Sequence, residues 1–226
     1  HNTFFMEFSS LLNYYPMEGF CMKINSTKLL TLKKWIFFLI FCVSELCVSF
    51  FIGIYSSLVL KVIHISVFST LLILYMIKSS HSLKYYGIHL QYPISQIYCS
   101  ITTFLVLLLL YYQIADFDLW RYHELRLLQA LSVSYFFQTL LTAIYIEFVW
   151  HCFFLSLLKE LTTETFSLIF TSILCGVLYF PMNFSINLLI QTISFSFVMG
   201  YLRCKSPEKF TLFSLTLIHI FWNLLH

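Results

Sequence analysis

The sequence ends with the apolar run FTLFSLTLIHIFWNLLH, residues 210–226, and this stretch decides the fold. As a helix rising about 1.5 Å per residue, such a run crosses most of the hydrocarbon of a bilayer. His219 and Asn223 are four positions apart, so their side chains lie on one helical face, one turn from each other. Lipid offers neither of them a hydrogen-bond partner, and we therefore expect this face to point into the protein.

A second apolar run carries a polar pair at the same spacing. It reads AIYIEFVWHCFFLSLL, residues 143–158, and it places Glu147 and His151 one helical turn apart. A carboxylate at mid-membrane depth is costly unless it is paired, protonated or hydrated. We therefore predict that this helix meets the helix of residues 210–226 and that their polar faces form the functional site.

The composition places the chain in a membrane. Of its 226 residues, 60% are hydrophobic, 20% are aromatic and only 10% are charged. A water-soluble domain of this composition could not cover its surface with polar groups. We predict an all-α, polytopic integral membrane bundle of about seven helices, at roughly 20 residues per span. The net charge of +3 comes mainly from lysines beside the spans, so the lipid bilayer and not a nucleic acid is the expected partner.

Three regions organise the expected spans. Residues 1–34 form a cytoplasmic or interfacial segment, residues 35–130 hold the first helices and a connector, and residues 131–226 form the core with both polar pairs. The connector, residues 113–129, carries several charges and is expected to lie partly as an amphipathic helix at the membrane surface. The expected spans are residues 35–52, 62–77, 94–112, 131–158, 166–180, 183–202 and 210–226.

The basic residues predict the topology. With a cytoplasmic amino terminus, they follow the positive-inside rule. The cytoplasmic segments then hold Lys23, Lys28, Lys33, Lys34, Lys78, Lys84, Lys159, Arg203, Lys205 and Lys209, against Lys61, Arg121 and Arg126 outside. The two polar helices then run in opposite directions, with Glu147 on the order of 17 Å and His219 on the order of 14 Å above their cytoplasmic ends. The plasma membrane or the endoplasmic reticulum is the expected location.

The two polar pairs can support acid–base chemistry. In this interpretation Glu147 activates a water, His219 and His151 orient it, and Asn223 stabilises an oxyanion. A divalent metal such as zinc is an alternative, with His151, His219 and Glu147 as candidate ligands. Two imidazoles, one carboxylate and no HExxH motif make a weak zinc site, however. Three other polar residues of the spans are expected to join helices by hydrogen bonds: Glu45, His64 and Gln191.

At these residues the chain resembles the CPBP family, membrane proteins that include the type II CAAX prenyl proteases and the Abi, or bacteriocin-processing, proteins. That family carries EExxxR on one helix, FxxxH on the next and HxxxN or HxxxD on the last. The corresponding stretches here are IEFVWH at 146–151, CGVLY at 175–179 and HIFWN at 219–223. The resemblance covers about residues 132–226. It implies a four-helix core and proteolysis of a membrane-presented, possibly prenylated, carboxyl-terminal peptide.

Several positions depart from the family motifs. Ile146 stands where the family has its first glutamate, to which water activation is assigned. His151 replaces the arginine, Cys175 the phenylalanine and Tyr179 the histidine of the second motif. The family identities are kept at Glu147, His219 and Asn223.

These departures leave two functions open. The first is an intramembrane endopeptidase with Glu147 as the base, which requires Glu147 and His219 to share a water in a cavity. The second is a noncatalytic relative that keeps the fold as a scaffold, immunity or regulatory protein and binds a membrane partner; packed, dry surroundings of Glu147 favour it. A small transporter with Glu45 and Glu147 as a proton relay has less support, because the charges are too few to trace a path.

Overall fold

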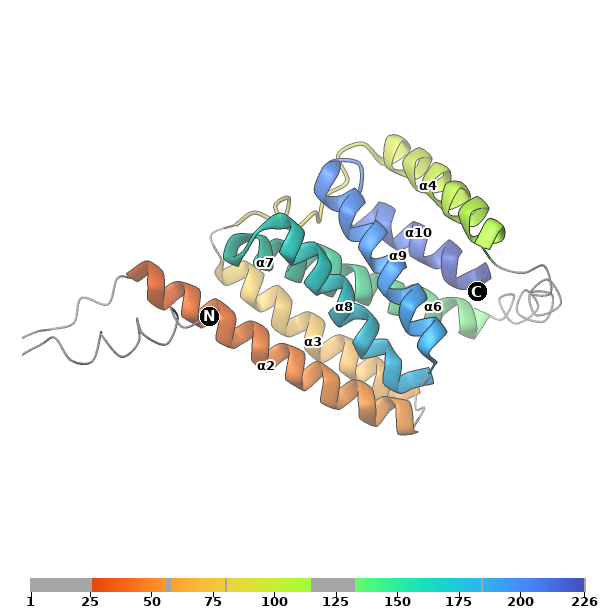
Figure 1. Ribbon diagram of the computed structural model, residues 1–226. Coiled ribbons are helices and arrows are strands. Elements are labelled where there is room, and N and C mark those ends of the chain that lie inside the picture. The colour runs from red at the N-terminus through yellow and green to blue at the C-terminus, as the bar shows by residue number, and fades with distance from the viewer. Residues whose placement is uncertain (1–25, 56–57, 80, 115–132, 184, 226) are drawn as a thin grey trace, which may run out of the picture. The chain divides into compact units, whose positions relative to one another are not determined.

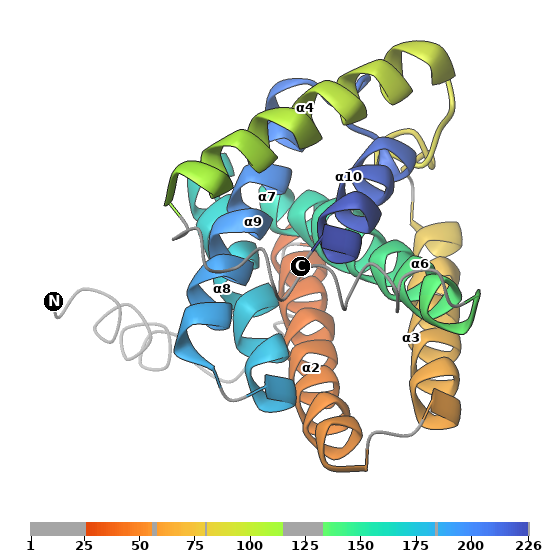
Figure 2. The same ribbon diagram turned by 90° about the vertical axis from the view of Figure 1, so that its right-hand side faces the viewer.

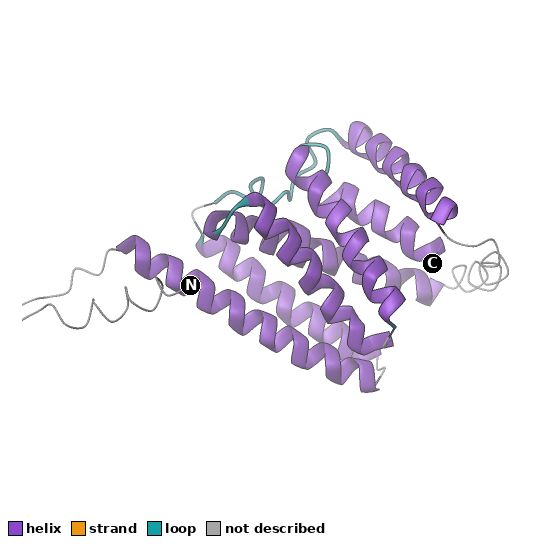
Figure 3. Cartoon of the chain, viewed as in Figure 1, coloured by secondary structure: helices purple, strands orange, loops and turns teal. Residues whose placement is uncertain are grey.

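The computed structural model describes residues 26–55, 58–79, 81–114, 133–183 and 185–225. All regular structure in these residues is helical, and no strand occurs among them (Figure 1, Figure 3). The chain divides into two compact units, residues 1–36 and residues 37–226. The first unit is described only where it contributes the start of helix α2, and everything below concerns the second.

The described residues form a series of helices that follows the predicted spans closely. The elements are α2 (Ser26–Tyr55), α3 (Leu58–Lys78), α4 (Pro93–Ile114), α6 (Val133–Ile146), η2 (Glu147–Phe154), α7 (Leu155–Leu161), α8 (Glu164–Asn183), α9 (Ile186–Lys205) and α10 (Leu212–Leu225). Because α6, η2 and α7 continue into one another without a break, the described chain has seven helical stretches. The predicted all-α membrane bundle is confirmed.

Four of these stretches are long and apolar enough to cross a membrane. They are Lys28–Phe51, Val59–Lys78, Pro93–Leu110 and Tyr135–Leu161. Two shorter apolar helices, Glu164–Leu178 and Leu212–Leu224, accompany them. The exposed side chains of the long helices are largely aliphatic and aromatic, which a lipid environment tolerates and water does not. The protein is therefore a multi-pass membrane protein.

Most predicted boundaries differ from the structure, usually by a few residues. The helix expected to stop at Pro181 continues to Asn183 as the end of α8. A proline lacks one N–H donor, and the loss of this single hydrogen bond in a last turn does not end the helix at once. The predicted connector, residues 113–129, begins as the last residues of α4, which ends at Ile114, and its remainder lies outside the described residues.

The carboxyl-terminal helices pack mainly in pairs, with α8 against α9 and α10 against α4 and α6. Helices α8 and α9 lie side by side, and α4 and α6 flank α10 (Figure 1, Figure 2). A cluster of buried apolar residues, Phe195, Met199, Phe210, Leu215 and Ile218, joins α9 to α10. Both α9 and α10 also contact η2, the segment that follows α6.

An aromatic cluster fixes the position of the segment η2. All eight residues of η2 are buried. Phe154 packs edge-on against Phe38 and Phe41 of α2, with ring centroids 5.1 and 4.8 Å away. Phe153 stacks on Tyr86 of the loop after α3 at 5.6 Å. Aromatic pairs at these distances add to the free energy of burial, so η2 is held from several sides at the centre of the described helices.

Candidate functional site

The candidate site begins with a π-helical segment. Helix α6 ends at Ile146, and the chain then continues as the π-helix η2 from Glu147 to Phe154 before it resumes an α-helix. We expected an ordinary α-helical turn here. A π-turn is wider and admits one more residue per turn, and such segments occur often at functional sites. In η2 the wider turn surrounds the polar pair with fully buried aromatic side chains.

The structure brings three of the predicted site residues together. The Oε2 atom of Glu147 lies 2.7 Å from Nδ1 of His151, and its Oε1 atom lies 2.6 Å from Nδ1 of His219 on α10. Glu147 is completely buried, at 0% exposure. The two helices therefore meet through the polar residues, as their matched spacing predicted. The carboxylate bonds to both imidazoles directly, instead of sharing a water with His219.

Helix α9 supplies a partner that the sequence did not reveal. The Nε2 atom of His151 lies 2.9 Å from Oγ of Ser196 and 3.0 Å from its carbonyl oxygen. One turn further, Gly200 leaves room for the cluster, since a Cβ there would lie 2.6 Å from Leu168 and 3.5 Å from the His151 ring. The small residues Ser196 and Gly200, four positions apart, were the available signal for a close helix approach.

The hydrogen-bond partners limit the proton positions in this cluster. With Glu147 ionised, each histidine donates its Nδ1–H to one carboxylate oxygen. Nε2 of His151 faces both oxygens of Ser196, so a neutral ring accepts from the Ser196 hydroxyl, whereas a protonated ring donates to the Ser196 carbonyl oxygen. Nε2 of His219 keeps its lone pair and has no hydrogen-bond partner among the described residues. The basic atom that this cluster presents is therefore on His219 and not on the carboxylate.

The other predicted residues lie apart from this cluster. Asn223 is half-buried one turn beyond His219, and no hydrogen bond joins it to the three clustered residues in the described chain. Ile146 is buried and lines a separate cavity. Cys175 is buried on α8, and the side chain of Tyr179 lies outside the description. The role predicted for Asn223 therefore stays a prediction, since an oxyanion-stabilising amide need not bond to the base.

A second buried polar cluster lies on the other side of Ile146. The carboxylate of Glu45 on α2 bonds to Nε2 of His64 on α3 at 2.8 Å and accepts a hydrogen bond from the Tyr145 hydroxyl at 2.7 Å. These residues line a cavity of about 90 Å³ together with Ile146. Glu45 and His64 were expected to join helices by hydrogen bonds, and they do so across α2 and α3. The contribution of Tyr145 from α6 was not foreseen.

The first cluster does not fit a resident metal ion. No group of three or more metal-ligating side chains with suitable geometry occurs in the described part of the chain. Both oxygens of Glu147 and both ring nitrogens of His151 are already engaged in hydrogen bonds. A zinc ion would need these same atoms at ligand distances of about 2.0–2.2 Å. We therefore derive no chemistry from a metal.

Comparison with known proteins agrees with the motifs. Residues 128–225 match the family described as type II CAAX prenyl endopeptidase Rce1-like. This part of the chain is therefore similar to the Rce1-like family. Among curated proteins and solved structures, none matches the chain. In this Rce1-like core the matched residues include η2, α8, α9 and α10, which together hold Glu147, His151 and His219.

Proposed function

We propose that this protein is a noncatalytic Rce1-like membrane protein, which keeps the fold of the prenyl endopeptidases to bind a membrane-presented peptide or lipidated partner. One observation carries the proposal. The carboxylate of Glu147 is fully buried, and both of its oxygens already accept hydrogen bonds from imidazoles. A carboxylate in this state cannot take a proton from water, and Ile146 supplies no second carboxylate beside it.

Peptide binding and peptide cleavage place different demands on such a fold. Binding a peptide needs a partly apolar membrane surface, and exposed apolar side chains on α6 and α8, such as Phe136, Ile144 and Ile173, support this role. Cleaving it needs a water held between a free base and groups that stabilise charge in the transition state. The cluster has contacts that suit a structural role. Glu147 bonds to His151 within η2 and to His219 of α10, and His151 bonds to Ser196 of α9.

A specific observation favours hydrolysis as a second candidate. The contact between Glu147 and Nδ1 of His219 leaves Nε2 of His219 as a free base, oriented by a buried carboxylate. In such a pair the imidazole would take a proton from water, the hydroxide would attack the scissile carbonyl, and the proton would pass to the departing amine. Here Glu147 would orient the histidine and would not contact the substrate.

One experiment distinguishes the candidates. The purified chain in liposomes is incubated with a farnesylated carboxyl-terminal peptide that carries a photoreactive group and a fluorescence-quenched scissile bond. The expected result is saturable cross-linking without cleavage, in a preparation that shows an intact cooperative unfolding transition. Cleavage by the unaltered chain overturns the proposal. If that cleavage disappears in His219→Gln but persists in the control His81→Gln, which changes a partly exposed histidine outside the cluster, the hydrolase is established instead. Absence of cross-linking excludes the proposed binding.

A further inference from the structure

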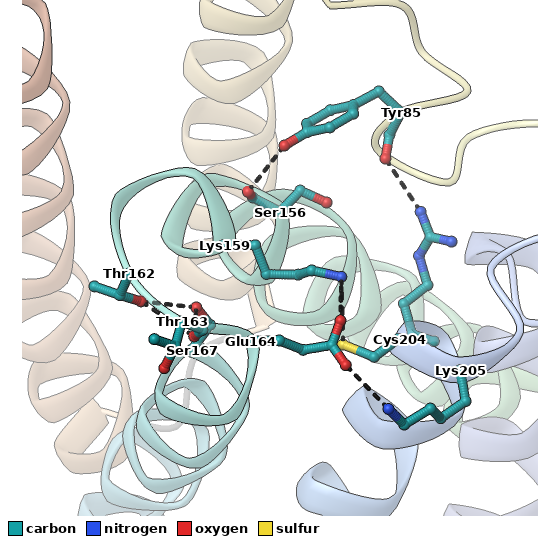
Figure 4. Close-up of polar contacts among 10 residues, drawn as sticks. Tyr85, Ser156, Lys159, Thr162, Thr163, Glu164, Ser167, Cys204 and Lys205 are labelled. Carbon is teal, nitrogen blue, oxygen red and sulfur yellow. Dashed lines mark hydrogen bonds and ion pairs between the residues drawn. The ribbon is translucent and has the colours of Figure 1, made fainter.

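A small cavity lies at the end of the bundle where α7 and α9 finish. Its volume is about 110 Å³, and its lining includes Ser156, Lys159, Arg203 and Cys204, with Tyr85 of the loop after α3. Figure 4 shows Tyr85 above Ser156, and Lys159 reaching toward Cys204. The Tyr85 hydroxyl donates to the Ser156 carbonyl at 3.2 Å, which ties this loop to α7. The cavity therefore has walls from three separate segments of the chain.

The guanidinium of Arg203 is buried in this wall without a counter-charge. Arg203 is 6% exposed. Its two terminal nitrogens donate to the carbonyl oxygens of Pro207 at 2.9 Å and Tyr85 at 3.3 Å. Its Nε–H has no acceptor, and no carboxylate pairs with it in the described part of the chain. A buried cation that contacts only carbonyl oxygens is strongly stabilised when an anion binds beside it.

The charged residues that line the cavity are both cations, and the carboxylate of Glu160 beside Tyr85 is paired with His81 at 2.8 Å. Lys159 lies 2.9 Å from one carboxylate oxygen of Glu164, and Lys205 lies 3.2 Å from the other (Figure 4). Both lysines thus share a single carboxylate, and Arg203 adds a third positive charge. The Lys159 and Glu164 side chains are 35% and 42% exposed, and exposed ion pairs of this kind are weak. An incoming dianion can therefore compete with Glu164 for Lys159.

We propose that this cavity binds the phosphate group of an anionic phospholipid headgroup. A phosphate offers several acceptor oxygens, which suit the free Nε–H of Arg203 and the ammonium of Lys159. The cavity lies where α7 and α9 end, and the ends of helices in a membrane bundle are expected near the lipid headgroups. Basic residues cluster at the same end, a pattern that draws acidic lipids to a membrane surface: Lys78, Lys84, Lys159, Arg203, Lys205 and Lys209.

The test uses the full chain and matched lysine variants. Because Arg203 holds the loop in place, its replacement would disturb the fold, and Lys159→Gln is the informative change. Lys209→Gln is the control, since Lys209 is exposed at the same end and does not line the cavity. Binding of phosphatidic acid and of phosphatidylcholine to the purified protein is counted by native mass spectrometry at about 150 mM salt, where distant charges are screened.

We expect phosphatidic acid to bind in preference to phosphatidylcholine, with affinity about tenfold weaker in Lys159→Gln and unchanged in Lys209→Gln. If both variants lost the same affinity for phosphatidic acid, the lipid would bind by general attraction to the basic surface, and the proposed site would be wrong. Equal binding of the two lipids would also contradict the proposal. Thermal stability with inorganic phosphate or phosphatidic acid identifies the source of the phosphate. Stabilisation by inorganic phosphate alone, as large as that by the lipid, would overturn the lipid assignment.

Discussion

Replacement of Glu147 tests the buried cluster most directly. Glu147→Gln keeps one acceptor oxygen and turns the other into an NH₂ donor, so one of the two histidines loses its acceptor. A hydrogen bond to a charged group contributes roughly 1.5–3 kcal/mol, which corresponds to about a tenfold to hundredfold change in the folding equilibrium. Glu147→Ala removes both acceptors and leaves His151 and His219 buried without partners, at a cost of roughly 3–5 kcal/mol.

The assay is reversible unfolding of the purified protein in mixed micelles, followed by circular dichroism. Glu208→Gln is the control, because it removes an exposed carboxylate at the end of the bundle and should stay within about 0.5 kcal/mol of the parent. A double-mutant cycle between Glu147 and each histidine measures the two couplings separately. If Glu147→Gln and Glu147→Ala unfolded like Glu208→Gln, the cluster would not hold the helices together, and the reasoning about η2 would fail.

Two further predictions concern the surroundings of the site. Gly200→Ala places a methyl group 2.6 Å from Leu168, so it should destabilise the protein by about 1–3 kcal/mol in the same unfolding assay; an unchanged midpoint would show that Leu168 moves aside freely. Burial and the nearby Arg203 charge lower the pKa of His89 from its ordinary value of 6.5. The unfolded chain therefore binds a proton at higher pH than the folded chain, and this contribution to stability is complete above pH 6.5 and is lost as the pH falls. Melting temperatures between pH 8 and 5.5 should fall less in His89→Asn than in the parent, and parallel curves would contradict this.

The sequence was sufficient to predict the all-α membrane fold and the contact between the helices of Glu147 and His219. Apolar runs of adequate length predict spans, and the lysine distribution predicts that the helices of Glu147 and His219 run in opposite directions. Scarce polar residues in lipid-facing helices must find each other, so the contact between Glu147 and His219 followed from spacing and depth.

The other contacts of the two buried clusters depend on side-chain packing, which the hydrophobic pattern of the sequence does not predict. In a helix that is apolar on every side, hydrophobic periodicity does not indicate which face meets which neighbour. The hydroxyl of Ser196 could therefore not be paired with His151, nor Tyr145 with Glu45, before the structure was known. The π-turn at Glu147 has no residue signature of its own, so the sequence did not predict it.

The π segment Glu147–Phe154 also limits how the length of this chain can vary through evolution. Loss of one codon there would return the turn to α geometry and rotate the preceding helix by about 100° relative to the following one. Tyr145 and Glu147 would then swing away from their separate partners in a single event. Point mutations can alter each cluster alone, whereas an insertion or deletion removes both, so homologous chains should keep a constant number of residues across this stretch.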